Sequence, residues 1–167
     1  SFTNTLPQEG MKSLEMFSQE NQVTVASVIY AAWGLVLQKY INSGDIIFGT
    51  TVSGRSARIE GIEEMVGLFI NTLPLRVRSN REDTLLQVVN HINETLRERE
   101  QFETSSLVNI RRCSRVPSEE ALFDSILVIE NYPLDKRIIR ENSGLEIRSV
   151  SMLERTHYDL TVEVLLY

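Results

Sequence analysis

Cysteine is almost absent from this chain, because Cys113 is the only one among 167 residues. A chain with a single thiol cannot form an internal disulfide, so a disulfide-stabilised secreted fold is excluded. We therefore expect a reducing compartment, the cytoplasm. A free cysteine is usually a packing residue, and we interpret Cys113 as structural rather than as a nucleophile.

Basic charge is also in short supply, with 17 lysines and arginines against 23 aspartates and glutamates. The net charge of −6 argues against binding to nucleic acids or to anionic membranes, since both need a positive surface. No apolar run is long enough to cross a bilayer. The N-terminus has neither a start methionine nor the pattern of a signal peptide, and we expect a chain truncated at both ends.

Histidine is scarce as well. His91 and His157 stand far apart, and no cysteine cluster accompanies them, so the sequence carries no zinc signature and we expect no metal site. An imidazole titrates near neutrality and could act as a base, but neither histidine lies in a recognisable motif. We interpret both as surface or packing residues.

The apolar pattern predicts one domain of mixed α/β structure. Thr24 and Thr84 are suited to cap helices, and the charged run from Glu94 to Glu100 indicates a solvated helix face. Leu85, Val88, Val89, Ile92 and Leu96 are spaced to form the buried face of the same helix. The expected helices are Pro7 to Asn21, Thr24 to Tyr40, a long helix from Thr84, and Ser106 to Cys113. The expected strands are Ile46 to Val52, Val66 to Val77, Phe123 to Glu130, Leu145 to Met152, and Tyr158 to Leu166.

A phosphate-binding loop is the strongest literal motif match. Residues 49–56 have its G-x-x-x-x-G-K-S spacing after an expected strand, although Arg55 replaces the lysine. A planar guanidinium does not simply replace that compact charge, and the β-branched interior of the loop favours extended backbone. The residues that follow also form a poor helix start. Nucleotide binding is therefore not favoured.

Four segments in a fixed order carry a family resemblance. Residues 66–76 read Val-Gly-Leu-Phe-Ile-Asn-Thr-Leu-Pro-Leu-Arg and are similar to a Val-Gly-x-Phe-x-Asn-Thr-x-x-x-Arg signature. The supporting segments are residues 45–55, 123–133 and 158–164. Together they resemble the C-terminal half of a condensation domain of nonribosomal peptide synthetases. The family's His-His-x-x-x-Asp-Gly motif is absent, and residues 99–108 lack a histidine that many members carry.

This resemblance implies a mixed sheet flanked by helices, the C-terminal half of a chloramphenicol acetyltransferase-like fold. The parent enzyme would form amide bonds between thioesters tethered to carrier domains. This half would bind no cofactor directly, and the phosphopantetheine arms of the carriers would be its substrates. It would contain no catalytic residue, because the histidine motif lies elsewhere. The residues that the resemblance assigns to a substrate tunnel are Ser53, Gly54, Arg55, Gly67, Asn71, Thr72 and Asn131.

The implied partners are aminoacyl and peptidyl carrier domains and the missing N-terminal condensation subdomain. Without that subdomain, we expect the isolated chain to be inactive and to self-associate through exposed apolar surface. An epimerization or cyclization domain of the same fold, or a non-catalytic module that binds carriers, remains an alternative.

Two candidate residues have two interpretations each. Asn71 lies in an apolar run, so it either ties down a neighbouring loop or lines the tunnel. Arg55 either fixes its loop by pairing with an acid, such as Glu60 or Asp159, or lies near the site. For Arg55 we favour the structural role.

Overall fold

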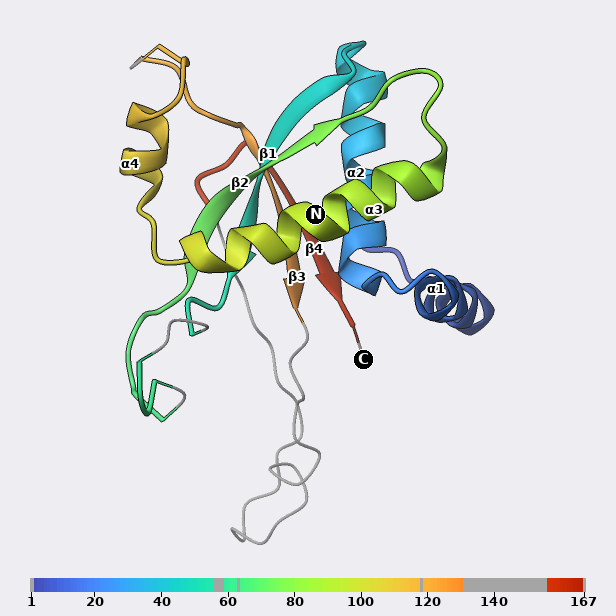
Figure 1. Ribbon diagram of the computed structural model, residues 1–167, viewed down its shortest axis with the longest axis horizontal. Helices are drawn as coiled ribbons and strands as arrows, with labels where there is room; N and C mark the ends of the chain where they lie inside the picture. Colours follow the sequence, from blue (N-terminus) through green and yellow to red (C-terminus); the bar gives the residue numbers. More distant parts are fainter. Residues whose placement is uncertain (1, 56–58, 63, 118, 131–155, 167) are drawn as a thin grey trace, which may run out of the picture.

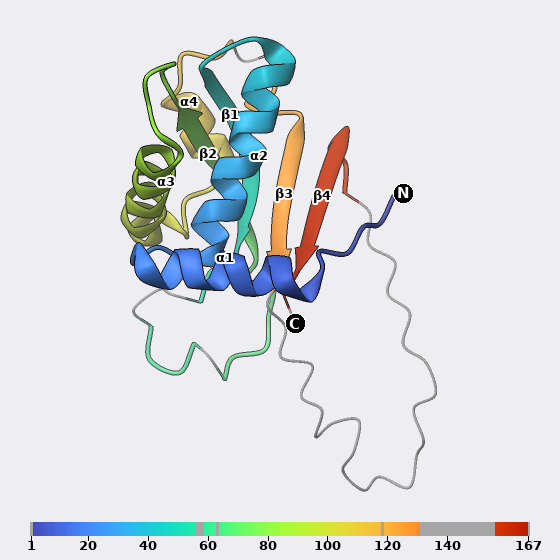
Figure 2. The same cartoon turned by 90° about the vertical axis from the view of Figure 1, so that its right-hand side faces the viewer.

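The computed structural model describes residues 2–55, 59–62, 64–117, 119–130 and 156–166. A four-stranded mixed sheet, in the order β2-β1-β3-β4, forms its centre (Figures 1 and 2). The helices are α1 (Gln8–Glu20), α2 (Val25–Ile41), α3 (Leu85–Arg99), the 3-10 turn η1 (Glu100–Phe102) and α4 (Leu107–Arg112). The strands are β1 (Asp45–Val52), β2 (Asn71–Arg78), β3 (Ser125–Glu130) and β4 (Leu160–Leu165). The mixed α/β architecture expected from the sequence is confirmed.

Strand direction determines which residues meet at each end of the sheet. β1 pairs with β2 in antiparallel register, with Val52 opposite Asn71 and Asp45 opposite Arg78. β1 pairs with β3 in parallel, and β3 pairs with β4 in parallel. The end of β1, the start of β2 and the ends of β3 and β4 therefore share one end of the sheet. We call it the Asn71 end.

One face of the sheet carries the hydrophobic core. Phe48 on β1 and Leu75 on β2 are fully buried there, and α2 and α3 pack over them. The hydroxyl of Thr24 accepts a hydrogen bond from the Ser27 amide and so caps α2, as its sequence predicts. α2 approaches β2 closely because Gly34 has no side chain: a Cβ there would stand 2.7 Å from Cγ2 of Val77. A larger residue at position 34 would therefore collide with Val77.

α3 begins with a capping box formed by Thr84 and Gln87. Val88, Val89 and Ile92 are buried as expected, but Leu85 is exposed. Asn93 is buried on the same helix, and its Oδ1 accepts a hydrogen bond from the Thr24 amide. This bond ties α3 to the start of α2.

The expected strand Val66 to Val77 is shorter in the structure. β2 begins at Asn71 and not at Val66, since residues 66–70 form an exposed segment without strand pairing. The strand expected at Leu145 to Met152 lies outside the described residues. Within the described ranges, no single helix is long and apolar enough to cross a membrane; α1 and α2 reach that length only as a pair bent by 107°.

Candidate functional site

The Asn71 end of the sheet gathers most of the predicted site residues. Ser53, Gly54 and Arg55 follow the end of β1, and Asn71 and Thr72 open β2 beside them. Gly67 lies further out in the exposed segment that precedes β2. Asn131 lies outside the described residues. The tunnel role that the family resemblance assigns to these residues stays a prediction.

Asn71 is fixed by three hydrogen bonds. Its Nδ2 donates to the backbone oxygens of Glu103 and Ser105, both at 2.8 Å, and its Oδ1 accepts from the Thr72 amide. Residues 103 and 105 belong to the segment that follows η1, so the side chain ties the start of β2 to the chain beyond α3. The loop-anchoring interpretation of Asn71 accounts for the two bonds to residues 103 and 105, and the third bond is local to β2.

Gly54 and Arg55 hold the connection between β1 and β2 together at its base. Gly54 has a φ of +66°, and a Cβ there would stand 1.9 Å from the Phe69 oxygen. Nη1 of Arg55 donates to the backbone oxygens of Ile62 and Met65, and the guanidinium lies 4.4 Å from the centre of the Phe69 ring. The structural role expected for Arg55 is therefore observed. The expected partners, Glu60 and Asp159, are wrong: backbone oxygens and a ring take their place.

The sequence did not reveal a polar cluster on the face of the sheet that α3 covers. The Arg99 guanidinium, at the end of α3, donates to the hydroxyl of Thr50, which is fully buried and itself donates to the Leu73 oxygen at 3.2 Å. Burial raises the pKa of the Tyr30 hydroxyl, and the charge of Arg99 acts in the opposite direction. Arg99 thus points inward, although its charged run predicted a solvated face. A buried threonine in an apolar strand was the available signal, because its hydroxyl needs a partner.

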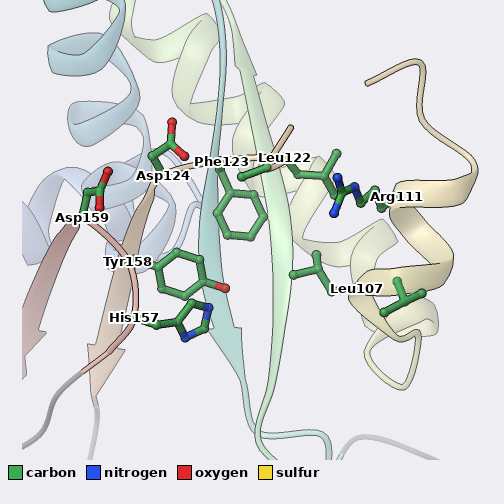
Figure 3. Close-up of a pocket in the computed structure, with 10 residues that line it drawn as sticks. Leu107, Arg111, Leu122, Phe123, Asp124, His157, Tyr158 and Asp159 are labelled. Carbon is green, nitrogen blue, oxygen red and sulfur yellow. The ribbon is translucent and has the colours of Figure 1, made fainter. Parts of the chain in front are cut away.

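The opposite face of the sheet carries an aromatic group. The Phe123 ring lies over Gly49 and stacks on Tyr158, with ring centres 5.5 Å apart (Figure 3). The centre of the His157 ring lies 4.2 Å from that of Tyr158. Burial raises the pKa of the Tyr158 hydroxyl, and a hydrogen bond with Thr72 acts against it. The Thr72 side chain, at the start of β2, therefore lies near the aromatic group.

A hollow of about 280 Å³ lies between this aromatic group and α4. Its α4 wall is formed by Leu107, Val108 and Arg111, as Figure 3 shows in part. His157 is exposed at its rim, in agreement with the predicted surface position, and His91 is exposed on α3. Cys113 is also exposed, so its expected role as buried packing is wrong.

Comparison with known proteins identifies what this chain is similar to. A family model described as "Condensation domain" matches residues 1–166. The chain is 42% identical over 159 residues to chondramide synthase cmdD of Chondromyces crocatus, a match covering 95% of the chain and 4% of that synthase. It is 40% identical over 158 residues to gramicidin S synthase 2 of Brevibacillus brevis, covering 92% of the chain and 4% of the synthase.

Solved structures support the fold. The first condensation domain of the calcium-dependent antibiotic synthetase, in complex with a substrate analogue, matches with a TM-score of 0.64 at 19% identity. That match covers 76% of this chain and 28% of the solved chain. The chain thus spans about 4% of the length of the curated relatives and less than a third of this solved structure.

Proposed function

This chain belongs to the condensation-domain family, and on that premise we propose that it is part of a nonribosomal peptide synthetase. The synthetase would form amide bonds between aminoacyl or peptidyl groups that its carrier domains hold as thioesters. The observation that carries this proposal is the family match over residues 1–166, supported by about 40% identity to synthases of peptide antibiotics. The whole protein would act in the cytoplasm.

The chain would supply the C-terminal half of the domain. Its sequence contains no His-His-x-x-x-Asp-Gly motif, so a general base would come from the N-terminal half. In the reaction, the acceptor amine attacks the donor thioester carbon and forms the new C–N bond. The base takes a proton from the amine and passes it to the sulfur as the C–S bond breaks, so the donor pantetheine leaves as a thiol. No described residue of this chain is assigned to the proton transfer.

The contribution of this half would be to hold the pantetheine arm. That arm carries amides, which need a small number of fixed donors and acceptors. The Asn71 end offers such groups in a fixed arrangement, since the Asn71 side chain and the Thr72 amide are both held by hydrogen bonds. Ser53 is exposed beside them at the end of β1. Here the loop-anchoring bonds of Asn71 would support binding by fixing the neighbouring backbone.

The exposed segment before β2 is expected to be covered by a partner in the complete protein. Val66 is 104% exposed and Leu68 is 92% exposed. Apolar side chains that stand out so fully in a soluble protein commonly mark a surface for a partner. We propose that the N-terminal half and a carrier domain cover this region of the chain.

The test begins with the gene upstream of this chain, where the histidine motif should be found. The complete domain is then expressed with one carrier loaded with a donor and one with an acceptor. Mass spectrometry should detect a dipeptidyl thioester on the acceptor carrier. An altered configuration without a new amide bond would indicate an epimerization domain instead, and a heterocycle would indicate a cyclization domain. No product, beside an active condensation domain as positive control, would overturn the proposal.

A further inference from the structure

Between β1 and β2, the described residues 53–55, 59–62 and 64–70 form no helix or strand. β1 ends at Val52 and β2 begins at Asn71, directly opposite it. The two limbs of this connection touch where Gly54 meets the Phe69 oxygen, a contact that leaves no room for a Cβ. The position of Phe69 therefore determines how the chain enters β2 two residues later.

Arg55, on the limb that follows β1, contacts the turn and the limb that leads into β2. Its Nη1 donates to the Ile62 oxygen and to the Met65 oxygen, the latter at 3.1 Å. Its guanidinium also lies over the Phe69 ring at 4.4 Å from the centre. Ile62 is only 5% exposed, so its buried side chain anchors the turn to which Arg55 is hydrogen-bonded.

These contacts need an arginine. The planar guanidinium can donate in its plane to two oxygens while its face lies on an aromatic ring. A lysine ammonium is a single compact charge and cannot make both kinds of contact with the same geometry. Backbone oxygens also accept from Arg55 at any pH, so no titrating carboxylate is involved in these contacts.

We infer that Arg55 is a positioning residue for the reaction site. It acts through Phe69: by holding the Phe69 ring and the turn at Ile62 and Met65, it fixes the backbone that leads into Asn71 and Thr72. The second hold on this backbone comes from Asn71, whose Nδ2 donates to the oxygens of Glu103 and Ser105. Loss of Arg55 leaves the sheet intact and releases only the limb before β2. The catalytic consequence rests on the proposed function, and the structural consequence does not.

The structural test is amide hydrogen exchange on the 167-residue chain, compared between wild type and Arg55→Ala. The amides of Ile62, Glu64 and Met65 donate to backbone oxygens in the turn that Arg55 grips. We expect their exchange to speed up by about tenfold or more, the scale for losing a charged hydrogen-bond donor, while β1 exchanges as before. Arg81→Ala removes an exposed arginine from the turn before α3 and is the matched control.

Two further variants protect the test against a folding defect. Phe69→Leu removes the ring and leaves Arg55 in place, so it should speed up the same amides by a smaller factor. Arg55→Lys should also speed up the exchange of these amides, since lysine keeps the positive charge but lacks the planar guanidinium. Unchanged exchange in both Arg55 variants, or faster exchange spread evenly over β1 and α2, would overturn the inference.

The catalytic test uses the complete domain with loaded carriers. Arg55→Ala should lower kcat by about tenfold per folded enzyme, with KM for the acceptor carrier changed less than kcat, because a misplaced site loses transition-state contacts. A kcat that falls only in proportion to the folded fraction would overturn the positioning role. If the wild-type domain forms no amide while the exchange result holds, the proposed function fails and the structural role of Arg55 stands.

Discussion

The Phe123 ring occupies the space where residue 49 would carry a side chain. A Cβ on Gly49 would stand 2.4 Å from Cε2 of Phe123, a distance that no real contact allows. The ring can approach β1 this closely only because residue 49 has no side chain, and from there it stacks on Tyr158. The absence of a side chain at residue 49 therefore makes room for the aromatic group on this face of the sheet.

Gly49→Ala should destabilise the protein by about 1–3 kcal/mol, the usual cost of overpacking a filled site. The measurement is urea unfolding followed by circular dichroism. Gly10→Ala is the control, because residue 10 lies in the helix α1 beside the exposed side chain of Leu6, where alanine is the better helix former. Equal midpoints for Gly49→Ala and wild type would show that Phe123 can leave the sheet without loss.

Asn71→Ala should lower the free energy of unfolding by about 1–3 kcal/mol, because two partly buried backbone oxygens lose their donor. Asn90→Ala, at an exposed site on α3, is the matched control and should change stability little. In the complete domain, we expect the condensation rate to fall by more than this loss of stability accounts for. Equal losses would make Asn71 a structural residue only.

Acid should weaken the ion pairs at the opposite end of the sheet. Hydrogen bonding to Arg76 lowers the pKa of Asp45 from 3.8 to about 2, with Arg78 acting in the same direction. The folded pKa lies below the unfolded value, so the stabilisation is complete above pH 3.8 and disappears as the pH falls to about 2.

Because Asp45 is exposed, the stabilisation should amount to no more than about 1 kcal/mol. Urea unfolding of wild type and Asp45→Asn at neutral pH and near pH 2 measures it. The difference between the two proteins should be present at neutral pH, should shrink in acid, and should fall with added salt. A difference that grows in acid would contradict this assignment.

The isolated chain should form no amide bond and should self-associate. Val66 and Leu68 stand out almost fully, and Tyr40 on α2 is 87% exposed. Analytical ultracentrifugation and binding of a hydrophobic dye test this expectation. A double variant, Val66→Ser with Leu68→Ser, should reduce both signals, whereas a monomeric wild-type chain that binds no dye would count against it.

Local signals in the sequence predicted most of the fold. Thr24 and Thr84 cap the helices as expected, because capping depends on residues close in sequence. The start of β2 was misplaced because residues 66–70 are as apolar as a strand, and only the exposure of Val66 and Leu68 distinguishes them. Leu85 fits the apolar spacing of α3 but lies in its first turn, where it is exposed.

The candidate site was predicted less completely, because its contacts join distant segments through the backbone. Asn71 was singled out as a polar residue in an apolar run, but its acceptors are the oxygens of Glu103 and Ser105, which any residue would provide. The acids proposed for Arg55 were the visible partners in the sequence, and backbone oxygens carry no sequence signal. Arg99 was hidden for another reason: it stands in a charged run, and its partner, the hydroxyl of Thr50, lies 49 positions away in the sequence.

The Arg99 contact sets a rule for building chimaeric synthetases. A crossover in the turn between β2 and α3 looks safe, because that turn is exposed. It would nevertheless take Thr50 from one parent and Arg99 from the other, and so separate two residues whose side chains are hydrogen-bonded to each other. Recombined chains should therefore inherit the whole stretch from β1 to the end of α3 from a single ancestor, or carry a matching threonine and arginine from both.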